Sequence, residues 1–344
     1  MIDRNDNPEY LNDFLAYNAT ILNKSPNTVK EYNYDLAHFL KFIRYHFGEV
    51  SVDPHELNKI KEIEIKDFPL SKVAKIELQD IHAFLQYLKD NYRSKAATLA
   101  RKVAAIRTFF NYLCNKMKLI PNNPTLNLDS PKLDKRLPKY LTLDESRRLL
   151  ETSAQKKPTG HGNHDNQERD FCMITLLLNC GMRLSELIGI NISDIDFDNR
   201  KLTVIGKGNK ERTIYLNDAC IDSISQYLAV RPRDQVKWDS RDALFLSEQR
   251  KRISKRSVEY IVKREIELAN IERPDKYSVH KLRHTAATLM YKYGNVDIRA
   301  LQELLGHKNI STTEIYTHVD NEQIRSAVES NPLSSGYKNI KTDE

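Results

Sequence analysis

The chain has 344 residues, which is enough for two domains with separate cores. Its formal net charge of +7 favours a polyanionic partner such as nucleic acid. It contains no long uncharged apolar run and no leader-like start, so we expect no membrane span and a cytoplasmic protein. Four scattered cysteines without a C-x-x-C pair predict buried free thiols.

Helical spacing of apolar residues dominates residues 1–128 and predicts an all-helical first domain. Ser25 is the expected N-cap of one of these helices, with Pro26 in its first turn. The predicted helices span residues 8–22, 26–48, 76–92 and 94–117, and residues 49–75 are expected to form an insertion with one or two short helices.

Basic residues on the last of these helices are candidates for contact with DNA phosphate, although a solvated surface is the simpler interpretation. Proline and basic residues then predict a linker over residues 129–139, suited to lie along a DNA backbone. The candidate DNA-contacting residues are Lys95, Arg101, Lys102 and Arg107 on the helix, and Lys135 and Arg136 in the linker.

A second domain is predicted over residues 140–330, followed by a tail at 331–344. It opens with a capping box between Thr142 and Glu145. The pattern then predicts helices at 142–153, 169–179, 184–190, 218–230 and 258–269, with a hairpin of strands at 201–205 and 212–216. The fold class is therefore two-domain and mainly α, with a small antiparallel sheet in the second domain.

A basic cluster precedes the helix at 258–269, where the helix dipole disfavours cations, so an anionic partner is as good an explanation as solvated surface. Its members are Arg250, Arg252, Lys255 and Arg256. A polar loop with His161, His164 and Asp165 has the residue types of a metal site but no further ligands, and we expect no metal there.

Two arginines, two histidines, a lysine and a tyrosine combine into a chemical pattern. Guanidinium groups clamp phosphate, and a phenol becomes a nucleophile when other groups take its proton and stabilise the developing charge. Taken singly, each residue has an ordinary structural explanation, and only the set indicates function. The set is Arg183, Lys207, His280, Arg283, His307 and Tyr316.

The set resembles the tyrosine site-specific recombinases, most closely the Xer group of chromosome resolvases. The matching segments occur in the family's order and are Gly181-Met-Arg183-Leu-Ser-Glu186-Leu, Gly206-Lys207-Gly-Asn-Lys-Glu-Arg, His280-Lys-Leu-Arg283-His284, Leu305-Gly-His307 and Thr313-Glu-Ile-Tyr316-Thr-His. The resemblance implies a SAM-like four-helix bundle that binds core DNA, joined to a mixed α/β catalytic domain.

The resemblance also implies the role of each residue. Tyr316 would attack a DNA phosphate and form a 3′-phosphotyrosine, while Arg183 and Arg283 clamp the phosphate oxygens. Lys207 would protonate the leaving 5′-oxygen, His280 would act as acid and base, and His307 would donate a hydrogen bond. Glu186 would orient its neighbours, and His284 and His318 are supporting residues. Such chemistry needs no cofactor, metal or ATP.

Assembly is implied in the same way. The expected partner is double-stranded DNA, bound by a homo- or hetero-tetramer on two recombination sites. A helix near 320–330 would be exchanged between protomers, and a DNA translocase is a possible activator. The resolution of chromosome or plasmid multimers is the expected process. The alternatives are an integrase or transposase of a mobile element, a type IB topoisomerase, and a DNA-binding regulator with an idle site.

Overall fold

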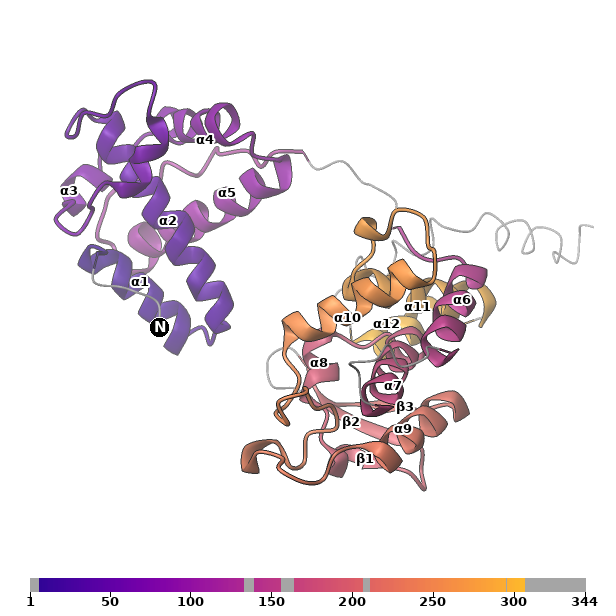
Figure 1. The fold of residues 1–344 in the computed structure, drawn as a ribbon. Helices are drawn as coiled ribbons and strands as arrows, with labels where there is room; N and C mark the ends of the chain where they lie inside the picture. Colours follow the sequence, from indigo (N-terminus) through magenta and orange to yellow (C-terminus); the bar gives the residue numbers. More distant parts are fainter. Residues whose placement is uncertain (1–5, 133–138, 156–163, 207–210, 295, 307–344) are drawn as a thin grey trace, which may run out of the picture. The chain divides into compact units, whose positions relative to one another are not determined.

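The computed structural model describes residues 6–132, 139–155, 164–206, 211–294 and 296–306. The chain divides into two compact units, residues 1–135 and 136–344 (Figure 1). This is the predicted two-domain class, mainly helical with a small antiparallel sheet. The finer boundaries remain predictions, and the expected exchange helix at 320–330 and the tail at 331–344 lie outside the described residues.

The first unit is a helical bundle that closely follows the predicted pattern. Ser25 caps the second helix, since its side chain accepts a hydrogen bond from the Thr28 N–H at 3.2 Å. Four long helices contribute most of the core, and two short ones lie in the chain between the second and the third of them. The elements are α1 Glu9–Thr20, α2 Pro26–His46, the 3₁₀ helix η1 Leu57–Glu62, α3 Leu70–Val73, α4 Leu78–Tyr92, α5 Ala96–Asn111 and the π-helical turn η2 Tyr112–Lys116.

The segment predicted as an insertion, residues 49–75, is integrated into this core. Ile60, Ile65 and Phe68 are buried among the residues of the main helices. The Tyr10 hydroxyl donates to the Phe68 carbonyl at 3.1 Å, and the Tyr87 hydroxyl donates to the Leu57 carbonyl at 3.0 Å. The segment therefore stabilises the first unit, and it includes the predicted short helices η1 and α3.

The second unit is built around α7, which packs against α6, α9 and α11. The predicted capping box opens α6, where the Thr142 N–H donates to Glu145 Oε2 and the Glu145 N–H donates to Thr142 Oγ1. The helices are α6 Leu143–Gln155, α7 His164–Cys180, α8 Leu184–Gly189, α9 Asp218–Val230, α10 Lys255–Leu268, α11 Val279–Tyr293 and α12 Ile298–Leu305, with 3₁₀ turns η3 Ile192–Asp194, η4 Trp238–Ser240 and η5 Pro274–Lys276.

A three-stranded antiparallel sheet, in the order β1-β2-β3, covers one part of this unit. It comprises β1 Ile195–Asp196, β2 Lys201–Ile205 and β3 Glu211–Tyr215. Lys201 pairs with Tyr215 and Ile205 pairs with Glu211, which confirms the predicted hairpin. Strand β1 was not predicted, because two residues carry no readable alternation.

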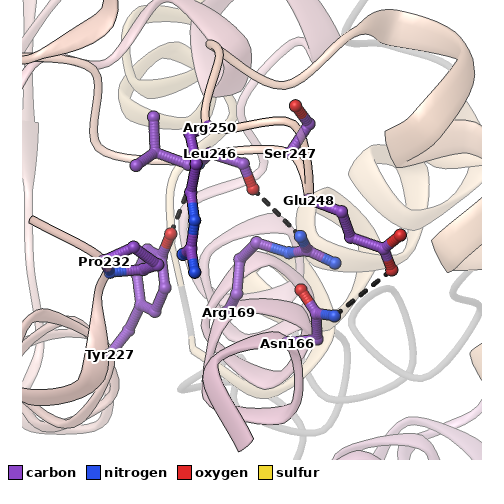
Figure 2. Close-up of a pocket in the computed structure, with 8 residues that line it drawn as sticks. All are labelled: Asn166, Arg169, Tyr227, Pro232, Leu246, Ser247, Glu248 and Arg250. Atoms are coloured by element: carbon purple, nitrogen blue, oxygen red, sulfur yellow. Dashed lines mark hydrogen bonds between the residues drawn. The ribbon is translucent and has the colours of Figure 1, made fainter. Parts of the chain in front are cut away.

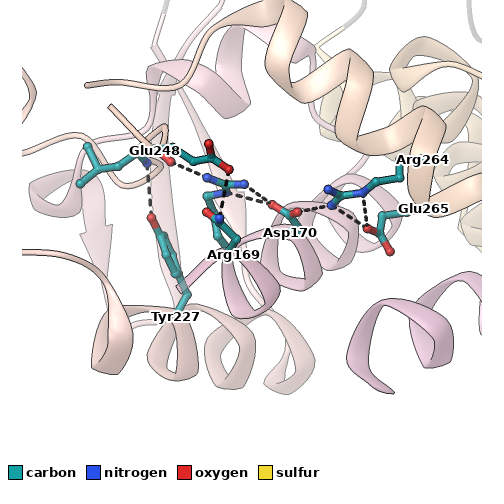
Figure 3. Close-up of polar contacts among 8 residues, drawn as sticks. Arg169, Asp170, Tyr227, Glu248, Arg264 and Glu265 are labelled. Carbon is teal, nitrogen blue, oxygen red and sulfur yellow. Dashed lines mark hydrogen bonds and ion pairs between the residues drawn. The ribbon is translucent and has the colours of Figure 1, made fainter. Parts of the chain in front are cut away.

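A buried ion network ties α7 to α10 (Figure 3). The Asp170 carboxylate binds the Arg169 guanidinium at 2.8 Å and the Arg264 guanidinium at 2.5 Å. Arg264 also pairs with Glu265 at 2.9 Å, and Ser153 of α6 donates to the same glutamate at 3.2 Å. We call Arg169, Asp170, Arg264 and Glu265 the scaffold cluster.

Three of the four cysteines, Cys172, Cys180 and Cys220, are buried free thiols as predicted. Cys114 is a free thiol as well, but it is only partly buried, at the end of the helical first unit. Among the described residues, no helix has both the length and the apolar character needed to cross a membrane.

Candidate active site

Arg183 stands where α7 ends and α8 begins. Gly181 breaks α7 with a left-handed backbone of φ +57°, and a Cβ there would lie 3.2 Å from Leu305 Cδ2 and 3.3 Å from Ala286 Cβ. Arg183 then caps α8, and its N–H donates to Glu186 Oε2 at 2.7 Å. Its guanidinium donates to Glu186 Oε1 and to the Gly306 carbonyl, each at 2.8 Å.

Arg283 reaches the same place from α11. It is buried, and it donates to the Gly181 carbonyl at 2.6 Å and to the Leu305 carbonyl at 2.5 Å. These two bonds fix the guanidinium between the break after α7 and the end of α12. The predicted proximity of the two arginines is therefore present in the structure, although their roles remain proposals.

His280 lies one turn before Arg283 on α11 and is exposed. Its Nε2 lies 3.1 Å from His284 Nε2, within hydrogen-bonding distance. Partial burial, and then the charges of Arg283 and Lys281, lower the pKa of His280 below its ordinary value. The lowered pKa favours the neutral imidazole, which is the form that can accept a proton.

The three residues share one cavity of about 600 Å³, lined by Met182, Arg183, Leu184, Ser185, Lys255, Glu259, Ser278, Val279, His280 and Arg283. Its charged lining is mainly cationic, which favours an anionic ligand. The other three predicted catalytic residues, Lys207, His307 and Tyr316, lie outside the described residues. So do His161, part of the rejected metal loop, and His318.

Among the DNA-contact candidates of the second unit, Lys255 lines the same cavity. Arg256 is exposed and lines a neighbouring hollow of about 710 Å³, next to Tyr260. Both positions agree with a surface that can meet an anion.

Arg252 also lines this hollow and is partly exposed. Its guanidinium donates to the carbonyls of Ile188 and Ile190, at 2.9 and 3.1 Å, and to Asn191 Oδ1 at 2.6 Å. These bonds hold the chain after α8, and DNA contact through Arg252 stays a prediction.

Arg250 borders a small cavity of about 40 Å³, beside Tyr227 and Arg169 (Figure 2). The cavity is large enough for one or two water molecules and too small for a nucleotide. Arg250 is partly buried there, with a left-handed backbone of φ +58°. Its position indicates a turn residue, and DNA contact through it stays a prediction.

The first unit corrects a further prediction. Lys102 is only 4% exposed, and its ammonium pairs with Asp35 at 2.8 Å, so it cannot reach DNA phosphate. Arg101 is exposed but pairs with Glu31 at 2.7 Å and with Asp35. Lys95 is exposed at the start of α5, and Arg107 donates to Ser130 Oγ at 3.1 Å. The linker candidates Lys135 and Arg136 lie outside the described residues.

Comparison with known proteins decides the family. The phage integrase family model matches residues 139–323, and the model of its N-terminal SAM-like domain matches residues 55–116. The chain belongs to the phage integrase family. It is thus a tyrosine recombinase, an enzyme that cuts and rejoins DNA at specific sites through a tyrosine intermediate.

Individual members of the phage integrase family agree over nearly the whole chain. Tyrosine recombinase XerC of Caldanaerobacter subterraneus subsp. tengcongensis is 52% identical, covering 95% of this chain and 88% of the relative. Tyrosine recombinase XerD of Staphylococcus saprophyticus is 35% identical, covering 88% and 90%. The fold matches XerH recombinase bound to its palindromic difH substrate, with a TM-score of 0.65, 21% identity, and coverage of 96% and 98%.

One residue of this recombinase site was missed from the sequence. Arg212 of β3 binds both carboxylate oxygens of Glu186, at 3.2 and 2.9 Å. Its place offered a signal, since in an alternating strand it shares a face with buried Ile214. A charged residue on the inward face of a strand calls for a buried partner.

Within the described residues, no group of three or more histidine, cysteine, aspartate or glutamate side chains is arranged to hold a metal ion.

Proposed function

We propose that this tyrosine recombinase cleaves DNA with Tyr316 as nucleophile, at a phosphate held by Arg183 and Arg283. The observation that carries the proposal is the shared cavity of about 600 Å³, where both arginines and His280 meet. In this proposal Arg183 and Arg283 form the phosphate clamp, and His280 accepts the proton of the nucleophile. Lys207 and His307 would complete the set from the chain segments that follow Gly206 and Gly306.

The clamp keeps donors available for substrate. A guanidinium has five N–H donors, and Arg183 uses two of them, one on Glu186 and one on the Gly306 carbonyl. The remaining donors can meet the non-bridging oxygens, whose negative charge grows in the transition state. Because these donors are held in place before the reaction, little reorganisation is needed when the charge develops.

The proton transfers balance with the residues present. The Tyr316 oxygen forms a bond to phosphorus, and its proton passes to His280, whose lowered pKa favours the neutral ring. The bond from phosphorus to the 5′-oxygen breaks, and Lys207 protonates that oxygen. The 3′-phosphotyrosine retains the energy of the phosphodiester, so rejoining by a 5′-hydroxyl needs no ATP.

The expected biological process is the resolution of chromosome or plasmid multimers in the cytoplasm. The XerC and XerD relatives, at 52% and 35% identity, support this role over that of a mobile-element integrase. The enzyme would work as a homo- or hetero-tetramer on two DNA sites, exchange a helix near 320–330, and respond to a DNA translocase. Suicide duplexes made from DNA near the replication terminus and from mobile-element ends would distinguish the two roles by which of them traps the protein covalently.

Covalent capture tests the nucleophile. A nicked suicide duplex should trap wild-type protein as a covalent complex, and Tyr316→Phe should trap none. Tyr293→Phe is the matched control, because Tyr293 is an exposed phenol of the same unit, 59% exposed at the end of α11. Covalent capture by Tyr316→Phe at the wild-type level would reject Tyr316 as the nucleophile.

A further inference from the structure

Arg212 connects Glu186, the partner of Arg183, to the end of α12, and it has no role in the chemistry above. It is mostly shielded, with 15% of its side chain exposed. Its Nε and Nη2 donate to the two oxygens of Glu186, and its Nη1 donates to the Leu304 carbonyl. A single side chain therefore links β3 to both α8 and α12.

We infer that Arg212 is a positioning residue for DNA cleavage, which neutralises Glu186 so that Arg183 keeps its charge for the phosphate. The inference rests on the proposed function, because it assigns Arg183 to the substrate. It concerns the charge and the aim of Arg183, and Arg212 itself need not touch DNA.

The first support is the charge on Glu186. Its side chain is fully buried, which by itself would raise the pKa, but hydrogen bonds from Arg212 and from the Arg183 backbone and side chain outweigh burial and bring the pKa to about 2. A full negative charge therefore lies beside Arg183 at any working pH. With Arg212 present, two guanidiniums face one carboxylate among the described residues, and these three side chains carry a net charge of +1.

Loss of Arg212 would change that balance. The cluster of Arg183, Arg212 and Glu186 would fall to zero net charge. Arg183 would then be the only described cation paired with the Glu186 side chain. A guanidinium and a carboxylate favour a two-bond pairing, so Arg183 would turn further toward Glu186 and away from the cavity. A displacement on the order of 1 Å in a positioned group can slow a reaction by about 100-fold.

The second support is the end of α12. Three successive carbonyls there, of Leu304, Leu305 and Gly306, accept hydrogen bonds from Arg212, Arg283 and Arg183 respectively. The last carbonyls of a helix lack partners within the helix and carry partial negative charge, so cations stabilise them.

Gly306 shows how tightly Arg212 is placed. Its backbone is left-handed, with φ +62°, and a Cβ would lie 3.1 Å from Arg212 Cδ and 3.6 Å from Arg183 Nη1. The chain turns directly beneath the two arginines because this residue has no side chain. His307 is the next residue in the sequence, so Arg212 also fixes the point from which the chain leads to it.

Two charge-balanced variants separate this role from simple structural support. Arg212→Gln sets the cluster charge to zero and should slow single-turnover cleavage of a nicked suicide duplex by about 100-fold, with DNA affinity little changed. Adding Glu186→Gln returns the charge to +1. The double variant should then cleave at least about 10-fold faster than Arg212→Gln, because the carboxylate that neutralises Arg183 is gone. Arg212→Lys keeps the charge and should stay within about 10-fold of wild type.

Arg231→Gln is the matched control for the loss of a buried arginine. Arg231 is 8% exposed and donates to the carbonyls of Arg241, Ala243 and Leu244, remote from the cluster in its contacts. It should lower the melting temperature yet leave the cleavage rate at 25 °C unchanged. Melting temperatures of all variants show which ones fold.

The outcomes are distinct. If wild-type protein forms no covalent complex, the proposed function fails. If wild type is trapped but Arg212→Gln cleaves equally fast, the inference alone is overturned. A folded double variant slower than Arg212→Gln, or a folded Arg212→Lys as slow as Arg212→Gln, would also overturn it, since additive damage indicates structural support only.

Discussion

Two arginine–carboxylate clusters of the second unit differ in net charge. In the scaffold cluster, Arg169 and Arg264 face Asp170 and Glu265, so the formal charges sum to zero. In the site, Arg183 and Arg212 face Glu186, which leaves +1 when the charges of the described residues are summed. Both clusters are largely shielded from water, and both join elements distant in sequence, α7 to α10 in the scaffold cluster and α8 to β3 in the site.

The difference lies in what each cluster is built to receive. Buried charges are costly unless they are paired and hydrogen-bonded, so a cluster that only joins helices is most stable when it is neutral. A site for phosphate does better with uncompensated positive charge, which the substrate then neutralises. Under the proposed roles of Arg183 and Arg212, the excess charge beside Glu186 serves the reaction, whereas the neutral pairing of the scaffold cluster serves stability.

Breaking the scaffold cluster should have the largest effect, and that effect should be a loss of stability. Asp170→Asn leaves two guanidiniums with less negative charge, and removal of one partner from a buried pair typically costs about 3–5 kcal/mol of unfolding free energy. Urea unfolding measures this loss. Cleavage per folded molecule should remain at the wild-type level.

Glu248→Gln is the control, an exposed carboxylate near the same cluster that accepts a hydrogen bond from Asn166 (Figure 2). Its unfolding free energy should change by less than about 0.5 kcal/mol. A stable Asp170→Asn protein with slow cleavage would mean that the scaffold cluster acts in the chemistry, and the contrast between the clusters would be wrong.

Breaking the cluster of Arg183, Arg212 and Glu186 should instead lower the rate of DNA cleavage. Arg183→Gln removes a positioned donor and the excess charge, so single-turnover cleavage should fall by about 100–1,000-fold, or about 2.7–4 kcal/mol. The melting temperature should change far less than for Asp170→Asn, because the Arg183 side chain is 30% exposed. Arg200→Gln, at an exposed pair with Asp218, is the control and should cleave normally.

The sequence predicted most of the fold, since helical periodicity and caps are local signals. Ser25, Thr142 and Glu145 cap their helices as predicted, and the hairpin at 201–216 is present. The integration of residues 49–75 into the core was not predicted, because their short apolar pieces carry no period of their own.

Side-chain partners were harder to predict than motifs. Arg183, His280 and Arg283 meet in one cavity as expected, because their motif spacing is specific. Lys102 was misassigned because its partner, Asp35, lies on another helix and only tertiary packing reveals the pair. The partners of Arg252 and Arg212 were not predicted for the same reason. Arg252 binds backbone carbonyls and Arg212 binds a buried glutamate, and sequence periodicity does not indicate such contacts.

The first unit shows a third way to bury a titratable group, which is to leave it neutral. His38 is 6% exposed, packs edge-to-face against Phe84, Tyr87 and Tyr92, and its Nε2 has no hydrogen-bond partner among the described residues. Burial, and then the charges of Lys102, Lys61 and Lys41, lower its pKa to about 3. Lys102 is paired with Asp35, but within the part of the chain that the structure describes no carboxylate contacts the His38 ring itself.

The smallest predicted effect is therefore a pH dependence of stability in the first unit. Because the folded pKa of His38 is lowered, its contribution is fully present above the unfolded pKa of about 6.5 and is lost as the pH falls toward 3, at up to about 1.4 kcal/mol per pH unit. Urea unfolding at pH 7 and pH 5 measures the loss. His38→Phe keeps a ring among the aromatic neighbours but cannot titrate, so it should lose less stability over this interval than wild type. Equal losses in both proteins would show that His38 tolerates a charge in the core, and that neutrality is not its means of burial.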